Sequence, residues 1–498
     1  MLLRKNLLLS LSLLGSGLFA QHAHRLPEGS PKTFFYATMD ADHAEKLKFL
    51  HPQDVKIVQR TNNEAAVHLS NHAASDLHQF VLSHGPGFIQ HPSKEQALEY
   101  VQRPQDRNLS VLNFNITEDE WVNQLINQVK EENIESLILA FESIHTRHHL
   151  STTNNVGMDY IKNKWQEIID ASGRNDLKVE FFTHRNTPQK SVIFTIEGNE
   201  EASEFIIIGG HADSIVSASW SGNYELRSPG ADDNASGIAT ITEALRILVE
   251  NGFKPKKTIQ IMAFAAEEVG LVGSNEIATK YKNEGKNVKA YVQFDMTNYK
   301  GSTKDVYITT DSYNSNDLNL FLVELMEHYN SKADQNAFTY GYTVCNYGCS
   351  DHASWANRGF PSAFPFEASF HDSNPYIHSA NDTYARSNNS SSHAAKFVKL
   401  ALEFLVEAAK PSADLGLDNV IHPTSKIAVH QKSLHYQLDK KMLNNRVKIL
   451  SPTGQTVYQA SELKSDGSLD LSALTSGLYI AIFESSHGGK FTSKFLLK

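Results

Sequence analysis

Two short runs of the chain, residues 205–208 and 259–264, are apolar on both faces. A strand of this kind must be covered on both sides, which is typical of a sheet with parallel strands between helices. Strand-like runs alternate with helical runs between residues 111 and 411, so we expect an α/β fold with a mostly parallel mixed sheet sandwiched by helices. The expected strands are 191–197, 204–208, 258–264, 290–294 and 305–309, and the expected helices are 118–129, 156–170, 236–250, 274–283 and 315–330.

The flanking parts of the chain differ from this pattern. Residues 21–110 interleave strand-like runs (33–38, 55–60, 64–69) with helical runs (41–49, 73–83), which predicts a small α+β unit. Residues 412–498 repeat strand and turn signals, which predicts a small all-β module. If the large unit is an exported enzyme, the first unit is expected to be a removable pro-segment that restrains it, and the simpler alternative is a domain that only assists folding.

The first twenty residues have the pattern of a cleaved export signal. Arg4 and Lys5 precede an apolar run at 7–14, and small residues end at Ala20. The run is too short to span a bilayer, and no later run reaches about 18 apolar residues, so we expect a secreted protein without a membrane span. The net charge of −10 and the lack of a long basic block argue against a nucleic-acid partner. We expect a monomer.

The chain has two cysteines, Cys345 and Cys349. Thiols four residues apart suit a metal site, a redox pair or a short disulfide. Because structural zinc takes about four ligands and exported proteins form disulfides, we favour a local disulfide.

Histidine and acidic residues follow the ends of expected strands, where open α/β sheets place their sites. His211 comes directly after an apolar strand, with Asp213 two residues on. Histidine is a natural zinc ligand, and an acid nearby is suited to hold its ring. Glu267 and Glu268 also follow a buried strand directly. Adjacent glutamates have no packing role there, so we expect one to bind a metal and the other to accept a proton from water.

Three further residues are less distinctive when taken singly. Asp233 opens an expected helix, where an acid also serves as a cap. Asp295 ends an apolar strand, and His378 lies in a turn-like segment. Together with His211 and Glu268 they make a set of imidazole and carboxylate ligands, and zinc accepts both types. Two ions that share one carboxylate need about this many ligands.

Residues from about 110 to 410 resemble the secreted bacterial leucyl aminopeptidases, members of the zinc exopeptidase group that also includes glutamate carboxypeptidases. The resemblance rests on six blocks in the family's order: GGHADS, PGADDNASGIA, AFAAEEVGLVGS, FDMTNYKGS, CNYGCSDHASW and PFEASFHDSNPYIHS. It implies the zinc exopeptidase fold, two Zn²⁺ per chain, and the removal of residues from peptides with a free N-terminus. It also implies that Asp233 bridges the two ions, with Glu268 and His378 completing one site and His211 and Asp295 the other.

The same resemblance implies roles for residues that do not bind metal. Glu267 is similar to the general base, Tyr347 to a helper at the oxyanion, and Asp213 to the residue that orients His211. Cys345 and Cys349 match a disulfide pair in the family.

A set of apolar residues aligns with the family pocket that receives an apolar first residue, although a place in the core is the plainer alternative for each: Met296, Phe364, Phe366, Phe370 and Ile377. Two positions depart from the family, because Phe364 stands where a methionine is common and Ser373 where an aromatic residue is common. The pocket therefore predicts a preference for large apolar residues such as leucine, with its depth left open.

The last unit resembles the C-terminal sorting domains of the type IX secretion system through VKILSPTG, LTSGLY and the final KFLLK. This resemblance implies contact with secretion machinery and an extracellular or cell-surface location. The rival interpretation is a substrate-binding β-module.

Other functions on the same fold remain open at this point. A carboxypeptidase or dipeptidase would need a basic pocket for a free carboxylate, and Arg227, Arg358 and Arg386 lie near the motifs. A glutaminyl cyclase relative would use a single zinc ion, which the five-ligand set disfavours. A non-catalytic receptor or adhesin would lack some of the ligands, and here all five are present.

Overall fold

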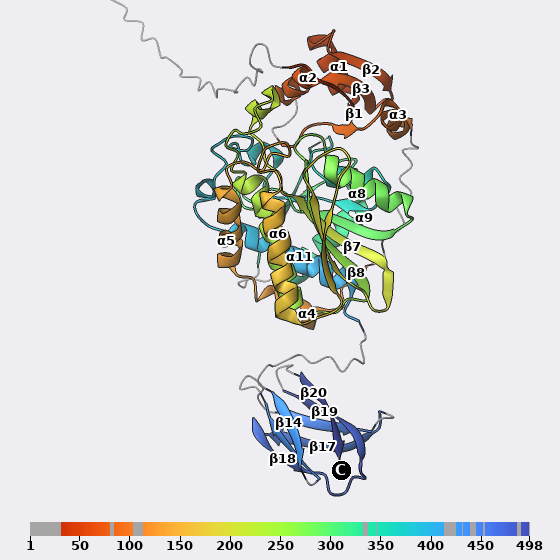
Figure 1. The fold of residues 1–498 in the computed structure, drawn as a ribbon, viewed down its shortest axis with the longest axis vertical. Coiled ribbons are helices and arrows are strands. Elements are labelled where there is room, and N and C mark those ends of the chain that lie inside the picture. The colour runs from red at the N-terminus through yellow and green to blue at the C-terminus, as the bar shows by residue number, and fades with distance from the viewer. Residues whose placement is uncertain are drawn as a thin grey trace, which may run out of the picture.

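The computed structural model describes residues 31–79, 84–102, 112, 114–331, 337–345, 347–412, 425–430, 432–438, 445–451, 454–485 and 490–497. The expected signal peptide lies outside these ranges. Figure 1 shows a small unit near the N-terminus next to a large α/β unit, and a separate β module at the C-terminus. Within the described ranges, no helix has both the length and the apolar character needed to cross a membrane.

A six-stranded sheet forms the centre of the large unit. Its order is β12-β9-β7-β8-β6-β5, and the pairs among β12, β9, β7 and β8 are parallel, whereas β6 and β5 are antiparallel. The sheet is therefore mixed, as the sequence predicted. The strands are β5 (Leu177–Phe182), β6 (Ser191–Ile196), β7 (Glu201–His211), β8 (Lys257–Phe264), β9 (Asn287–Gln293) and β12 (Ser362–Ala363).

Helices cover both faces of this sheet. Ile206 and Ile208 of β7 belong to the large apolar cluster formed with the helices α7 and α11, whereas Ile207 points to the other face and packs with α8. Because both faces are covered, β7 is apolar on both faces from Ile206 to Ile208, ahead of the glycines and His211 at its end. The helices of this unit are α4 (Asp119–Ile126), α5 (Glu131–Ser143), α6 (Val156–Ser172), α7 (Gly237–Glu250), α8 (Val272–Asn283), α9 (Asn316–Asn330), α10 (His352–Ala356) and α11 (Ser392–Ala409).

One expected strand lies elsewhere. Residues 305–309 were expected among the strands of the main sheet, but β10 (Val306–Thr309) pairs with β11 (Tyr340–Thr343) and β13 (Pro365–Phe366) in a second sheet of three strands. The edge of the main sheet beside β9 is taken instead by the two-residue strand β12. The strand itself was predicted, but its place in the main sheet was wrong. An apolar run indicates a buried strand, but it does not indicate which strand will pair with it.

The N-terminal unit is an antiparallel sheet with the order β2-β3-β1-β4, flanked by short helices. Its elements are β1 (Phe34–Asp40), α1 (Ala41–Leu50), β2 (Val55–Arg60), β3 (Glu64–Ser70), α2 (Asn71–Ser75), β4 (Ile89–His91) and α3 (Lys94–Gln102). In the described part of the helix expected at 73–83, α2 ends at Ser75 and a 3₁₀ turn follows over Asp76–Gln79, and residues 80–83 lie outside the described ranges. The apolar core of this unit is continuous with Phe364 and Phe366 of the large unit.

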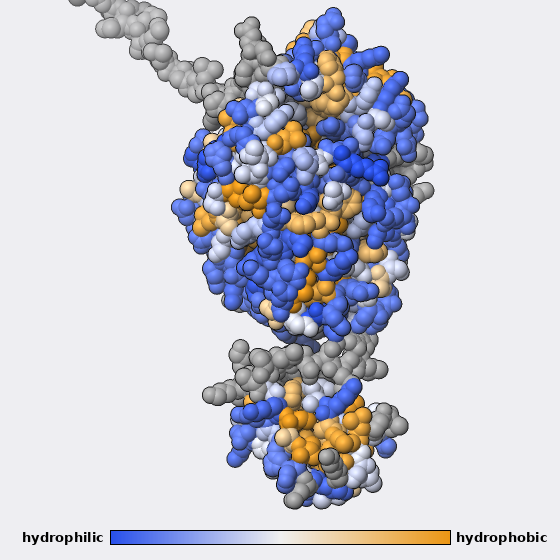
Figure 2. All heavy atoms as spheres, viewed as in Figure 1, coloured by the Kyte–Doolittle hydropathy of each residue, from blue (hydrophilic) through white to orange (hydrophobic). Residues whose placement is uncertain are grey.

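The C-terminal module consists of two antiparallel sheets, β14-β15-β18 and β17-β16-β19-β20. Its strands are β14 (Lys426–His430), β15 (Ser433–Gln437), β16 (Asn445–Leu450), β17 (Thr456–Leu463), β18 (Asp466–Asp470), β19 (Gly477–Glu484) and β20 (Lys490–Leu497). Figure 2 shows apolar side chains gathered on the visible face of this module. Its own core includes Leu434, Val447, Ile449 and Phe483.

Candidate active site

Three neighbouring parallel strands bring most of the expected ligands to one edge of the sheet. His211 is the last residue of β7, Glu268 follows the end of β8 by four positions, and Asp295 follows the end of β9 by two. Because parallel strands end at the same edge, these side chains meet there. All three are almost fully buried.

Asp233 and His378 join the other three from turns. Asp233 lies in the distorted turn Ala231–Ser236 ahead of α7, where the Asp382 carboxylate accepts hydrogen bonds from the backbone N–H groups of Asp232 (3.2 Å) and Asp233 (3.0 Å). His378 has a positive φ of 53°, an uncommon conformation for a non-glycine residue. The structure thus brings all five expected ligands together.

The two carboxylate oxygens of Asp233 face two different pairs of residues. Its Oδ1 lies 3.1 Å from His211 Nε2, which in turn lies 3.2 Å from Asp295 Oδ1. Its Oδ2 lies 3.1 Å from His378 Nε2, which lies 2.8 Å from Glu268 Oε2. The geometry gives two adjacent sites that share one carboxylate.

The residues present fit bound zinc. Within the described part of the chain, both oxygens of Asp233 and Glu268 and Oδ1 of Asp295 are buried, and no amide or hydroxyl group donates a hydrogen bond to them. Buried charged groups of this kind are stabilised only by a pairing partner or a metal. Imidazole nitrogen and carboxylate oxygen are both zinc ligands, and three of these residues, His211, Asp233 and Glu268, have ligand atoms within 4.8 Å of one another.

Glu267 lies beside this centre but does not pair with its histidines. It is fully buried, and burial raises the pKa of its carboxyl group well above the usual value. A divalent cation next to it would favour the charged form. Burial raises the pKa of this carboxyl group and a bound cation would lower it, so the group is suited to accept and return a proton.

Asp213 positions three groups of the site at once. Its Oδ1 accepts a hydrogen bond from the Glu267 N–H (3.0 Å) and its Oδ2 from the Glu268 N–H (3.2 Å). The same Oδ1 lies 3.5 Å from Nδ1 of His211. The sequence predicted only the contact with His211. Asp213 also reaches the backbone of the two glutamates because β7 and β8, which precede these residues, are neighbouring strands.

Arg147 is a residue of the site that sequence reasoning missed. Its buried guanidinium donates hydrogen bonds to the carbonyl oxygens of Ala212 (2.9 Å), Pro229 (2.5 Å) and Gly230 (2.8 Å). Burial lowers its pKa to about 10, so it stays charged at neutral pH. It therefore ties the turn after His211 to the turn before Asp233. No motif surrounds it in the sequence that points to this role.

The expected pocket residues lie together beside the centre. The rings of Phe364 and Phe366 have centroids 5.3 Å apart, and those of Phe366 and Phe370 are stacked at 4.8 Å. Met296 and Ile377 are buried in the same apolar cluster. Arg358 and Arg386 do not converge on a common pocket, since Arg358 bonds Asn275 and Arg386 lies over the ring of Tyr376.

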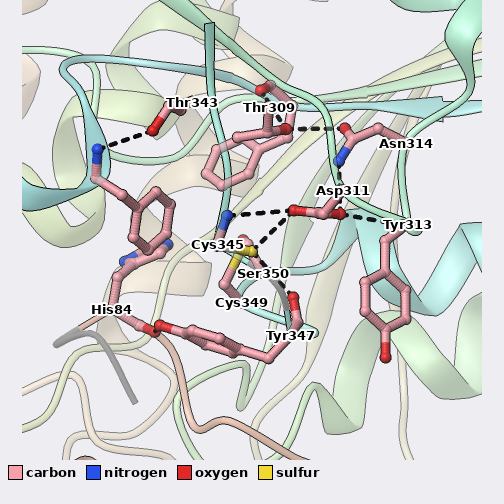
Figure 3. The surroundings of a disulfide bond; sticks show 12 residues. His84, Thr309, Asp311, Tyr313, Asn314, Thr343, Cys345, Tyr347, Cys349 and Ser350 are labelled. Atoms are coloured by element: carbon pink, nitrogen blue, oxygen red, sulfur yellow. Dashed lines mark hydrogen bonds between the residues drawn. A yellow bond between two sulfur atoms is a disulfide. The ribbon is translucent and has the colours of Figure 1, made fainter. Parts of the chain in front are cut away.

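Cys345 and Cys349 form the expected disulfide. Tyr347 lies between them in the chain, and Figure 3 shows its hydroxyl group directed at the backbone carbonyl of His84.

Comparison with known proteins identifies the family of the large unit and of the C-terminal module. Residues 191–403 match peptidase family M28, and residues 426–498 match the secretion system C-terminal sorting domain. A probable aminopeptidase of Saccharomyces cerevisiae is 33% identical over 328 residues, which cover 64% of this chain and 83% of the relative. The chain belongs to peptidase family M28.

Further similarities support this M28 assignment. A probable leucine aminopeptidase of Trichophyton verrucosum is 34% identical over 303 residues, covering 60% of this chain and 78% of the relative. The crystal structure of the LapA aminopeptidase of Legionella pneumophila covers 77% of this chain and all of its own, with 27% identity and a TM-score of 0.66. The M28 unit is thus an aminopeptidase of this family, and the sorting domain indicates secretion or display at the cell surface.

Proposed function

We propose that this protein is a secreted aminopeptidase that uses two zinc ions to remove large apolar residues, such as leucine, from the N-termini of peptides. The observation that carries the two-ion proposal is the arrangement of Asp233, whose two oxygens face separate ligand pairs. A single-zinc enzyme has no need of a second imidazole and carboxylate on the far side of the shared residue.

The side chains around the centre have distinct tasks in this proposal. When bound, zinc would acidify a water molecule and polarise the scissile carbonyl. Glu267 accepts the proton of the water and delivers it to the leaving amine, and Asp213 holds the Glu267 backbone in place for this transfer. Tyr347 donates a hydrogen bond to the substrate oxygen on which negative charge develops.

The apolar cluster of Phe364, Phe366 and Phe370 supports the preference for large apolar first residues. A buried aromatic wall stabilises an apolar side chain by about 25 cal/mol for each Å² removed from water. A charged side chain would lose its hydration there without gaining a partner.

Metal analysis and a substrate panel together test the proposal. We expect the purified catalytic unit, residues about 110–411, to bind about two zinc equivalents and to lose activity with a chelator. On aminoacyl p-nitroanilides we expect the leucine substrate to be cleaved faster than those of glutamate and lysine. One metal or none in an active enzyme would refute the two-ion site, and a faster rate on glutamate or lysine would refute the pocket.

A further inference from the structure

A segment of the N-terminal unit enters the candidate active site. His84 is 1% exposed, and its Nε2 lies 3.3 Å from Oδ2 of Asp295. Its ring lies among the aromatic residues of the expected substrate pocket, with centroids 6.0 Å from Phe364, 5.4 Å from Phe366 and 5.9 Å from Phe370. A side chain from outside the α/β unit therefore occupies the place expected for the first residue of a substrate.

The backbone of the same segment occupies a second feature of the site. The hydroxyl of Tyr347 donates a hydrogen bond of 2.6 Å to the carbonyl oxygen of His84 (Figure 3). Gly85 follows with a φ of +67°, and a Cβ atom there would lie 2.2 Å from the carbonyl oxygen of Cys349. Only glycine permits so close an approach of the segment to the disulfide loop.

Contacts beyond Gly85 anchor the segment to the rim of the site. The N–H of Gln90 donates to the carbonyl of Gly270, two residues after Glu268, at 3.0 Å. The ring of Phe88 lies 6.1 Å from that of Trp220. Ile89 is buried against Leu271 in a cluster shared by the two units. His84 therefore belongs to a folded unit that packs against the rim of the site.

The position of His84 is that of a metal ligand. Ligand atoms of His84, Asp233 and Asp295 all lie within 4.8 Å of one another. Oδ1 of Asp295 faces His211, and Oδ2 faces His84. Within the described residues, Nδ1 of His84 is buried without a hydrogen bond, so no other polar contact explains the burial of this ring.

We propose that His84 is a fourth protein ligand of the zinc ion held by His211, Asp233 and Asp295, and that the N-terminal unit thereby keeps the enzyme inactive. Catalytic zinc sites have three protein ligands and an open position, whereas structural sites have four. The imidazole of His84 occupies that open position and also fills the apolar pocket. The backbone carbonyl oxygen of His84 accepts the hydrogen bond of the Tyr347 hydroxyl. The inference rests on the proposed function, because it requires a metal on this side of Asp233.

Cobalt in place of zinc in the full-length protein tests the role of His84, since the visible absorption of Co²⁺ reports the ligands around it. His84→Phe keeps a ring in the aromatic pocket and removes the ligand, and His84→Asn serves if the first variant does not fold. The matched control is His68→Phe, because His68 belongs to the same unit and packs against Phe34 and Tyr36. Stoichiometry, affinity and spectrum are measured for each protein.

We expect the His84 variants to change the cobalt spectrum and to weaken the binding of one ion by about 10-fold or more, the loss that even indirect partners of a metal cause. His68→Phe should match the wild type. If a folded His84 variant keeps the wild-type spectrum and affinity, the proposal that His84 is a metal ligand is overturned, and the two-ion function is not affected. A wild-type chain that binds fewer than two cobalt ions would instead count against the two-ion function, and a chain that binds none would overturn both.

Discussion

Glu267 and Glu268 are adjacent in the chain but face different partners. Glu268 Oε2 lies 2.8 Å from Nε2 of His378. Among the residues that the structure describes, no amide or hydroxyl group donates a hydrogen bond to the carboxylate of Glu267. We expect Glu267→Gln to keep its zinc and to lower kcat by a factor of about 10² or more, as loss of a general acid–base group does. Glu268→Gln should lose zinc instead. Zinc content and kcat of both variants check this, and equal behaviour would contradict the division of roles.

Arg147 has a structural task that lysine cannot perform. Its planar group donates to several carbonyl oxygens in fixed directions, whereas an ammonium is a compact point charge. We expect Arg147→Lys to lower the free energy of unfolding by about 1–3 kcal/mol, since buried carbonyl oxygens lose their donors. Chemical denaturation measures this value. Arg446→Lys, in an exposed ion pair with Glu484, is the control and should change it by less than about 1 kcal/mol.

At the scale of the elements, α11 carries two buried glutamates with different surroundings. Glu403 accepts one hydrogen bond, from Asn330 at 2.8 Å, and burial raises its pKa from 4.5 to about 8. Glu407 accepts hydrogen bonds from the backbone N–H groups of Thr117 (3.0 Å) and Glu118 (2.8 Å). The first carboxyl group is thus neutral in the folded protein near pH 7, and the second anchors the start of α4.

This difference predicts opposite effects of the same substitution. A carboxyl group with a raised pKa in the folded state contributes stability that is present below pH 4.5 and is lost as the pH rises to about 8. We therefore expect Glu403→Gln to be more stable than the wild type at pH 8 and nearly equal at pH 5. Glu407→Gln should be less stable at both. Thermal unfolding at the two pH values measures this, and equal shifts for Glu403→Gln at both would contradict the assignment.

The elements also show what sequence alone could predict. β7 and β8 were predictable because both faces are apolar, and the ligands at their ends followed from the rule that sites lie where parallel strands end. The partner of β10 was missed because strand pairing depends on chain segments far away. The helix α11 was overlooked although its local sequence, rich in alanine and leucine, favours a helix. His84 and Arg147 reach the site from other parts of the fold, and no local pattern in the sequence links them to Asp295 or Gly230.

At the scale of the whole molecule, the N-terminal unit and the C-terminal module should differ in their effect on activity. All five expected metal ligands lie between His211 and His378, so neither flank supplies one of that set. We expect protein trimmed to about residues 110–411 to cleave Leu-p-nitroanilide faster than the full-length chain, because the segment at His84 no longer fills the site. Equal rates would leave only a folding role for the N-terminal unit, and a folded but inactive product would contradict the division into domains.

Removal of the C-terminal module alone should leave the reaction unchanged. Residues 425–497 form two sheets with their own apolar core. We expect a chain of residues 110–412 to have the same kcat and KM as a chain of residues 110–498, and a chain that ends at residue 412 but keeps the N-terminal region to fail in export. A loss of activity in the purified, folded product would instead favour a substrate-binding role for the module.

The shared carboxylate of Asp233 has a consequence for the heat resistance of the protein. Without metal, the folded chain confines the carboxylates of Asp233, Glu268 and Asp295 in one buried space, where their charges repel one another. The unfolded chain has no such crowding, so zinc binds the folded form preferentially. At free zinc 100 times the dissociation constant, this preference is worth about 2.7 kcal/mol per site. The midpoint of thermal unfolding should therefore rise with zinc concentration, and a newly exported chain should become hard to unfold only after it has captured its metal.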